Sequence, residues 1–424
     1  MGVKELWTVL APYAETKPRC ELRGKKIAID LSIWVVASLS VANYNKISRA
    51  DLRTVFFRTR RLISEGVIPI FILEGAAPKL KSQIICERAK LRFRGTKPSQ
   101  RNKAIRRTRF NQVLKQCKNL LQSMGVQCVY APGEAEAYCA FLNKKGLVDG
   151  VISQDSDCFA YGALRVYRNF SLSATEVEIY DMEKIKKKMD FGQNKAIVMA
   201  LLCGCDYCPG GIRGIGRINV QKLFNMYKDV EILQRIRSWR REDSKYTALE
   251  MRVDDNTICS NCGHGGRTQS HTKSGCGICG TREGCDESLW KEERLSLKTE
   301  LELRKKALTD PSFPSKKVIT EFLNEPTTAP RLNIIWQQPN MVTFVKKIRH
   351  LLQWTEIKCF QKFLPILARW QLKNMQRTNE LNTDTFPSVA KLIQIGIERG
   401  VFSQGNQEQL RNLKQKYPGV IEAF

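Results

Sequence analysis

The 424-residue chain is strongly basic, since 70 Lys and Arg residues outnumber 42 Asp and Glu residues and give a formal net charge of +28. This charge, with a pI near 9.6, points to polyanionic partners, nucleic acid ahead of an anionic membrane surface. No apolar run is long enough to span a bilayer and the N-terminus lacks a secretory pattern, so we expect a soluble intracellular protein without a membrane partner.

The first half of the chain alternates strand-like and helix-like segments. Short β-branched runs lie at residues 25–30, 67–74, 127–132 and 149–155, and longer amphipathic stretches separate them. This alternation predicts an α/β domain with a largely parallel central sheet flanked by helices.

A basic segment lies between the second and third predicted strands. Residues 79–109 hold twelve Lys or Arg and a single acid, Glu87. Gly95, Pro98 and a scarcity of apolar residues predict a basic arch or loop over 96–126. A run of like charges is most often a solvated face, but its position between two core strands favours contact with DNA or RNA.

From about residue 195 the sequence predicts helices. The helical pattern is interrupted over 240–290 by a polar, Gly-rich and Cys-rich insertion, resumes over 291–375, and gives way to a weakly patterned tail over 376–424. We therefore expect C-terminal helical additions to the α/β core.

Carboxylates follow three of the predicted strands. Asp30 ends the first strand, Glu74 ends the second, and Asp155 and Asp157 end the fourth. Ligand sites of open α/β sheets gather at the carboxyl ends of the strands, so we expect these acids at one edge. If Asp155 and Asp157 both lay on a strand, their side chains would also share a face.

Three further acids extend this set. Glu134 and Glu136 lie at the predicted start of a helix, and Asp206 precedes a glycine-rich turn. Each acid alone is most often a surface residue or a cap, but hard oxygen ligands suit Mg²⁺ or Mn²⁺. Two such ions about 4 Å apart clamp the attacking and leaving oxygens of a phosphodiester, so the seven acids together predict a two-metal nuclease.

The glycine-rich turn at 210–216 precedes a predicted helix. Such a turn exposes backbone N–H groups to phosphate, although glycine-rich turns are common. It does not follow a strand, which disfavours a dinucleotide site. Beside the acid set, we expect it to grip a duplex backbone.

Six motifs run in the order seen in the XPG/flap-endonuclease superfamily, which the chain resembles over about residues 1–235. They are MGVKELW, IAIDLSIW, FILEGAAPKLK, PGEAEAYCAFL, SQDSDCFAYGA and LLCGCDYCPGGIRGIG. The resemblance implies a PIN-like nuclease core with an N-terminal region over 1–95, an internal region over 127–239 and a helix-two-turn-helix over 203–230. It also implies a metal-dependent, structure-selective DNA nuclease.

The resemblance assigns roles by position. It implies that the two metal ions, Mg²⁺ with Mn²⁺ as a substitute, are held by Asp30, Glu74, Glu134, Glu136, Asp155, Asp157 and Asp206. It implies that Lys81 and Arg88 contact the scissile phosphate and act in catalysis with Asp30, Glu134 and Asp155. It implies that the helix-two-turn-helix holds K⁺ or Na⁺. We assign DNA contacts to Lys79, Arg101, Lys103, Arg106, Arg107, Gly211, Arg213, Gly214 and Gly216.

The subfamily features resemble the Gen-type Holliday-junction resolvases. Glu74 stands where replicative flap endonucleases usually have Asp, and the Cys-rich insertion is followed by LRKKAL and FPSKKVITEFL. This resemblance implies a nuclear enzyme that cuts four-way junctions and 5′ flaps and is a monomer that dimerises on junctions. The alternatives are a flap endonuclease or 5′ exonuclease of the same superfamily, and a non-catalytic DNA-binding protein that kept the fold.

The Cys-rich insertion contains two C-x-x-C pairs. Cys259 and Cys262 are separated from Cys276 and Cys279 by thirteen residues, close to the spacing of a zinc ribbon. Four thiolates would close a tetrahedral Zn²⁺ site, with His264, His271 and Cys285 as spare ligands. The alternative is an insertion whose thiols bind nothing; we favour zinc.

Overall fold

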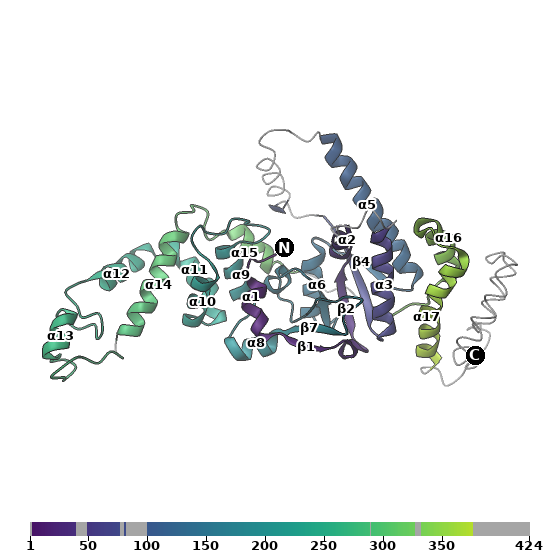
Figure 1. Cartoon of the computed structure of the whole chain (residues 1–424). Helices are drawn as coiled ribbons and strands as arrows, with labels where there is room; N and C mark the ends of the chain where they lie inside the picture. Colours follow the sequence, from purple (N-terminus) through teal and green to yellow (C-terminus); the bar gives the residue numbers. More distant parts are fainter. Residues whose placement is uncertain are drawn as a thin grey trace. The chain divides into compact units, whose positions relative to one another are not determined.

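The computed structural model describes residues 2–39, 49–76, 80–81, 100–288, 290–326 and 332–375 (Figure 1). The chain forms two compact units. The sheet unit comprises Ala14–Gln154, Ala163–Tyr180 and Pro326–Phe424, and the helical unit comprises Met1–Tyr13, Asp155–Gly162 and Asp181–Glu325. Each unit is thus assembled from three separated stretches of sequence.

A seven-stranded sheet forms the centre of the sheet unit, in the order β1-β7-β6-β5-β2-β3-β4. The strands are β1 (Glu15–Pro18), β2 (Lys26–Asp30), β3 (Ile68–Leu73), β4 (Gln127–Tyr130), β5 (Gly150–Ile152), β6 (Arg165–Arg168) and β7 (Glu176–Asp181). The pairs β2–β3, β2–β5, β3–β4 and β5–β6 are parallel, and β1–β7 is antiparallel. The predicted α/β class with a largely parallel sheet is confirmed.

The four predicted strands are β2, β3, β4 and β5. The near-continuous apolar runs of β2, β3 and β5 reflect burial on both faces, as expected for a parallel sheet covered by helices, whereas β4 lies at the sheet edge and is only partly buried. β1, β6 and β7 were not predicted, because their sequences ETKP, RVYR and EVEIYD interleave charged residues and contain no apolar run.

Helices cover the sheet and close the core of the sheet unit. They are α2 (Leu31–Leu39), α3 (Ala50–Ser64), α5 (Gln100–Ser123), α6 (Ala135–Lys144), α16 (Met341–Leu352) and α17 (Glu356–Met375), with the 3₁₀ turn η2 (Arg19–Leu22). On α3, Val55, Phe56 and Leu62 recur at helical spacing and are fully buried. The Phe56 ring lies 5.4 Å from that of Phe344 on α16, so the C-terminal helices complete the same core.

The arch or loop expected over 96–126 is a helix over most of its length, because Gln100–Ser123 forms the 24-residue helix α5. Its second half carries Cys117, Leu120 and Leu121, all fully buried in the core. This packed segment stabilises the preceding turns, because helix formation is cooperative. The prediction relied on the polar first turns and overlooked the apolar spacing that follows them.

The helical unit contains the remaining helices. They are α1 (Leu6–Leu10), α7 (Asp157–Ala160), α8 (Met182–Met189), α9 (Gln193–Cys203), α10 (Arg217–Met226), α11 (Asp229–Arg241), α12 (Asp243–Asp254), α13 (Thr268–Ser274), α14 (Lys291–Ala307) and α15 (Lys316–Leu323), with the 3₁₀ turn η1 (Ala11–Tyr13). The predicted helices of 291–375 correspond to α14 and α15 here and to α16 and α17 in the sheet unit.

A buried carboxylate joins three of these helices. Glu300 on α14 is 1% exposed and accepts hydrogen bonds from Arg235 (2.7 and 2.8 Å), Tyr227 (2.5 Å) and Trp239 (2.8 Å). Burial alone would raise the pKa of Glu300, but these donors lower it. Both carboxylate oxygens of Glu300 are therefore hydrogen-bonded. These bonds hold α11 and the end of α10, which Tyr227 follows, against α14.

Candidate metal and nucleic-acid site

Four acids of the sheet unit lie around the carboxyl ends of β2 and β3. Asp30 is the last residue of β2, and its parallel neighbour in the register is Ile72 of β3, two residues before Glu74. Glu134 and Glu136 lie at the start of α6, and the Ala135 N–H donates to Glu74 Oε2 (3.4 Å). The carboxylates of Asp30, Glu136 and Glu74 all lie near enough to the buried thiol of Cys139 to raise its pKa, after the larger effect of burial.

These acids are largely shielded from water. Asp30 is 6%, Glu134 6% and Glu136 8% exposed. The hydroxyl of Ser153, which follows β5, donates to Glu136 Oε1 (3.1 Å) and holds that side chain in place. No sequence pattern singles out Ser153, since its role depends on β5 lying beside β2.

Burial and mutual repulsion raise the pKa values of two of these acids. Burial raises the pKa of Asp30 to about 7, the neighbouring Glu74 carboxylate adds to the rise, and the Ser32 N–H donor (2.7 Å) opposes it. Burial also raises the pKa of Glu74, while Lys81 lowers it. Crowded carboxylates that resist ionisation are the environment that a divalent cation relieves, so this donor set fits Mg²⁺ or Mn²⁺.

Lys81 lies directly against the acids. Its Nζ is 2.7 Å from Glu134 Oε1, and its side chain is 27% exposed. Burial alone would lower the pKa of Lys81, but the ion pair with Glu134 raises it overall, so the ammonium stays charged. A cation held at the acid cluster, yet reachable from solvent, is suited to contact a phosphate.

The other predicted basic contacts are described less fully. Lys79 and Arg88 lie outside the described residues. Arg101, Lys103, Arg106 and Arg107 belong to the backbone of α5, and their side chains lie outside the described part of the structure.

The helical unit holds Asp155 and Asp157. They are not two residues of one strand, because β5 ends at Ile152 and Asp157 begins α7. The expected alternation of a strand therefore does not apply. Instead the Asp157 N–H donates to Asp155 Oδ1 (3.2 Å), a turn that begins the helix. Both side chains are buried, at 7% and 4% exposure.

The N-terminus packs against this pair, which the sequence did not reveal. Gly2 has φ +90°, and a Cβ there would lie 1.9 Å from Asp155 Oδ1. The Ser156 hydroxyl donates to the Val3 carbonyl (3.0 Å). Only glycine combines this backbone conformation with the required space, so residue 2 fixes the Asp155 carboxylate.

Asp206 lies in the turn between α9 and α10, as predicted, and is half-buried. The turn reverses through Gly211 (φ +56°) and Gly214 (φ +79°), and the Ile212 N–H donates to the Leu202 carbonyl (2.7 Å). A Cβ at Gly211 would lie 2.4 Å from the Cys203 carbonyl carbon. Gly211 therefore allows the close approach of the turn to the end of α9.

The outer part of this turn is open. No atom lies within 4 Å of where a Cβ would stand at Gly214 or Gly216, and Arg213 is exposed. Gly216 precedes α10 without a side-chain cap, and the Arg217 N–H donates to Glu5 Oε2 (3.2 Å). The helix start thus presents backbone N–H groups to acidic ligands, as a phosphate contact requires.

The Cys-rich insertion does not group its ligands as predicted. Instead of a set made of Cys259, Cys262, Cys276 and Cys279, the structure forms two groups. One contains Cys259, Cys262, His271 and Cys285, and the other Cys262, His264, Cys276 and Cys279. His264, His271 and Cys285, which the sequence offered only as spare ligands, thus belong to the groups, because α13 and the turns of the segment bring them to the C-x-x-C pairs.

Two family descriptions match the chain. The XPG N-terminal domain matches residues 1–94, and the XPG I-region matches residues 125–206. Together with the relatives below, these matches show that the chain belongs to the XPG/flap-endonuclease superfamily. None of the described helices is both long and apolar enough to cross a membrane.

Several relatives are named as GEN-type flap endonucleases. Flap endonuclease GEN of Drosophila pseudoobscura pseudoobscura is 61% identical over 419 residues, which cover 95% of this chain and 56% of that protein. Flap endonuclease GEN homolog 1 of Homo sapiens is 32% identical over 386 residues, covering 88% of this chain and 42% of that protein. The chain thus spans about half the length of the curated relatives it matches.

A solved structure is similar in fold. Human GEN1 in complex with Holliday junction DNA is 27% identical, with a TM-score of 0.66, and the match covers 90% of this chain and 82% of that chain. The nuclease-core fold predicted from the sequence is therefore confirmed.

Proposed function

We propose that the chain is a metal-dependent, structure-selective DNA endonuclease that resolves four-way junctions and cuts 5′ flaps. The observation that carries the proposal is the set of the buried acids Asp30, Glu134 and Glu136 and the partly buried Glu74, with Lys81 beside it. A chain of net charge +28 that nevertheless gathers acids at one sheet edge is suited to bring a phosphodiester to metal ions.

Seven acids would together bind two Mg²⁺ ions, with Mn²⁺ as a substitute. We propose Asp30, Glu74, Glu134, Glu136, Asp155, Asp157 and Asp206 as their ligands, by their positions in the motifs of the superfamily. When bound, such ions activate water and neutralise the oxygens of the cleaved phosphate. The chain's own contributions are to exclude water from Asp30 and to keep Glu136 oriented through Ser153.

Basic and backbone groups would hold the substrate. Lys81, with Arg88, would neutralise the scissile phosphate, and Lys79 with the basic residues of α5 would contact the strand backbone. The open turn with Arg213, Gly214 and Gly216 would hold duplex phosphate and a K⁺ or Na⁺ ion. We further propose a nuclear enzyme that is a monomer in solution and dimerises on four-way junctions, since symmetric cutting needs two active sites.

Cleavage of a sealed four-way junction and of a 5′ flap, each with and without Mg²⁺, tests the proposal. We expect metal-dependent cutting of both, with paired incisions in the junction. Cutting of the flap alone would instead indicate the flap endonuclease or 5′ exonuclease alternative, and binding without any cutting would indicate a non-catalytic protein.

A matched pair of double variants separates catalysis from binding. We expect Glu134→Ala with Glu136→Ala to keep junction binding and to abolish cleavage, because acids that repel phosphate are removed together with metal ligands. Glu176→Ala with Glu231→Ala removes two exposed acids instead and should leave cleavage unchanged. Retained cleavage in the first pair would contradict the assignment.

A further inference from the structure

The segment between α12 and α14 has a core built from cysteine. Its buried cluster consists of Cys259, Cys262 and Cys276, with Cys279 and Cys285 packed against it and no aliphatic or aromatic member. Five sulfur atoms bury far too little apolar surface to order a segment of this length by the hydrophobic effect. Some other cross-link is needed to hold the segment in this form.

Two hairpin turns of the same design present most of the thiols. In the first, the Cys259 N–H donates to the His264 carbonyl (2.8 Å) and Gly263 follows Cys262 with φ +75°. In the second, Cys276 and Thr281 exchange backbone hydrogen bonds of 3.2 Å, and Gly280 follows Cys279 with φ +71°. The Cys279 N–H also points at Cys276 Sγ (3.4 Å), an arrangement that favours a thiolate.

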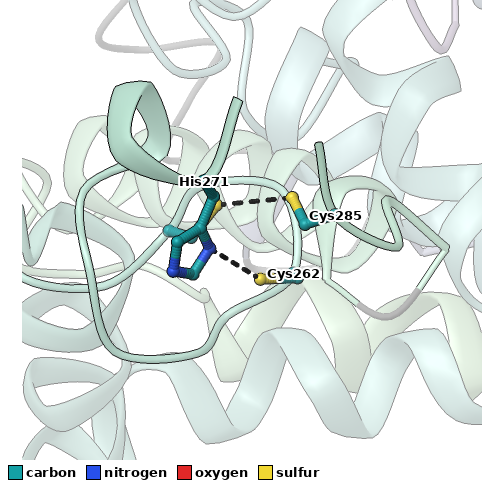
Figure 2. Close-up of side chains that lie close together, drawn as sticks. Cys262, His271 and Cys285 are labelled. Carbon is teal, nitrogen blue, oxygen red and sulfur yellow. Dashed lines mark hydrogen bonds between the residues drawn. The ribbon is translucent and has the colours of Figure 1, made fainter. Parts of the chain in front are cut away.

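The separations between the side chains match those of ligands on one tetrahedral ion. With Zn–S near 2.3 Å and Zn–N near 2.0 Å, two ligands of one Zn²⁺ lie about 3.5–3.8 Å apart. Cys259 and Cys285 Sγ are 3.7 Å apart, and His271 Nδ1 is 3.4 Å from Cys262 Sγ (Figure 2). In the second group, His264 Nδ1 lies 3.6 Å from Cys276 Sγ and 3.4 Å from Cys279 Sγ.

The ring of His271 is oriented as a metal ligand would be. Its Nε2 lies 3.1 Å from the Gly265 carbonyl, which can only accept, so Nε2 carries the proton. Nδ1 is then left as a lone pair directed at Cys262. Ligating histidines typically donate their other ring N–H to a backbone carbonyl in this way. His271 is 7% exposed, so this orientation is not set by solvent.

Cys262 belongs to both groups. Each group holds four donor atoms within 4.8 Å of one another, and Cys262 is counted in each. Its thiol interacts with Cys259 and Cys285 of the first group and with Cys279 of the second. Two tetrahedral ions that share one ligand need seven donor residues, which is the number that the two groups contain.

We propose that this segment binds two Zn²⁺ ions, one held by Cys259, Cys262, His271 and Cys285 and the other by Cys262, His264, Cys276 and Cys279. The Cys262 thiolate bridges the two ions. Five thiolates against two divalent cations leave a net charge of −1, which exposed basic side chains of the segment such as Arg282 offset.

The role of this cluster is structural. Trp290, which is 2% exposed, directly precedes α14. A Cβ at Gly263 would lie 3.0 Å from its ring. Arg252 on α12 stacks over the same ring at 4.4 Å. The first hairpin is therefore fixed to both α12 and α14, and the ions would fix the second hairpin to the first.

Native mass spectrometry of the full chain, purified without chelator, tests the proposal independently of nuclease activity. We expect two Zn²⁺ per wild-type chain and no disulfide in the denatured protein. A stoichiometry of one or zero would overturn the proposal. So would a Cys259–Cys285 disulfide, the other cross-link that their separation permits after a small movement.

Three variants separate a shared ligand from two independent sites. Cys285→Ser and Cys279→Ser each remove a ligand of one ion and should each retain one Zn²⁺. Cys262→Ser removes the bridge and should retain fewer than either, whereas Cys20→Ser, an exposed thiol outside the segment, should retain two. Full loading of Cys262→Ser would show that no bridge exists. Thiolate-to-metal charge transfer bands after Co²⁺ substitution of the wild-type chain provide a second readout.

Discussion

Lys81 Nζ lies 2.7 Å from Glu134 Oε1, so a residue expected to contact phosphate is paired with one expected to bind metal. The pair places a positive charge at the acid cluster when no divalent ion is bound. It also partly compensates the buried Glu134 carboxylate, which is 6% exposed. Lys81 therefore serves both the stability of the acid cluster and the binding of a phosphate.

Replacing Lys81 should affect cleavage far more than binding. We expect Lys81→Ala to slow single-turnover cleavage of a 5′ flap by roughly 10²–10³-fold, the usual effect of losing one charged donor at a reacting oxyanion. Junction affinity should change little, because many phosphate contacts remain. Lys17→Ala, which removes a surface lysine paired with Glu15, is the control. Equal cleavage rates in the two variants would place Lys81 outside the catalytic site.

Gly2 should be required for the position of Asp155. A Cβ in Gly2→Ala would overlap the Asp155 carboxylate and would also adopt a strained φ of +90°. We expect a loss of about 1–3 kcal/mol in the free energy of unfolding and a large loss of Mg²⁺-dependent cleavage.

Gly24→Ala separates strain from overlap. Gly24 has a similar φ of +78°, but nothing lies within 4 Å of its Cβ position. The Gly24→Ala variant should therefore lose a comparable amount of thermal stability, because its backbone is similarly strained, and it should retain cleavage. If both variants lost cleavage equally, the contact between Gly2 and Asp155 would have no functional role.

Metal-free protein should lose stability as pH rises from about 4 to about 7. Burial raises the folded-state pKa of Asp30 from 3.8 to about 7, so over this window the folded state keeps a proton that the unfolded state releases. Stability therefore falls with pH, by on the order of a few kcal/mol, and this contribution is constant above the folded pKa. Chemical denaturation at several pH values measures the slope.

The Asp30→Asn variant and Mg²⁺ provide the comparisons for this slope. Asp30→Asn cannot ionise at this position and should show a shallower fall with pH. Saturating Mg²⁺ should also flatten the wild-type slope, because a divalent ion stabilises the ionised carboxylates. Identical slopes in the variant and the metal-free wild type would mean that Asp30 is not the group responsible.

The basic residues of α5 should contribute to DNA affinity through phosphate contacts. The logarithm of the association constant should then fall linearly with that of salt concentration, at about −0.9 per duplex phosphate neutralised. Neutralising Arg101, Lys103, Arg106 and Arg107 together should flatten this slope without introducing sequence preference. The charge-matched control neutralises four exposed lysines of α8: Lys184, Lys186, Lys187 and Lys188. An equal change in both proteins would indicate a general charge effect.

Local sequence patterns determined much of the fold and of the candidate site. Short apolar and β-branched runs predicted β2, β3, β4 and β5, and in β2, β3 and β5 the run reflects burial on both faces of the sheet. The acids that follow these strands were predicted to lie together, since parallel strands end at the same edge. Asp30 and Glu74 do lie there, and Glu136 of α6 joins them near Cys139.

Only the tertiary structure decided the contacts that depend on residues far apart in the chain. Gly2 packs on Asp155 because its φ is positive, and the sequence gives a glycine no sign of which conformation it adopts. Cys262 falls into two groups of ligands because two hairpins and α13 bring His264, His271 and Cys285 to it. Spacing along the chain limits which residues can meet, but packing and backbone hydrogen bonds decide which of them do.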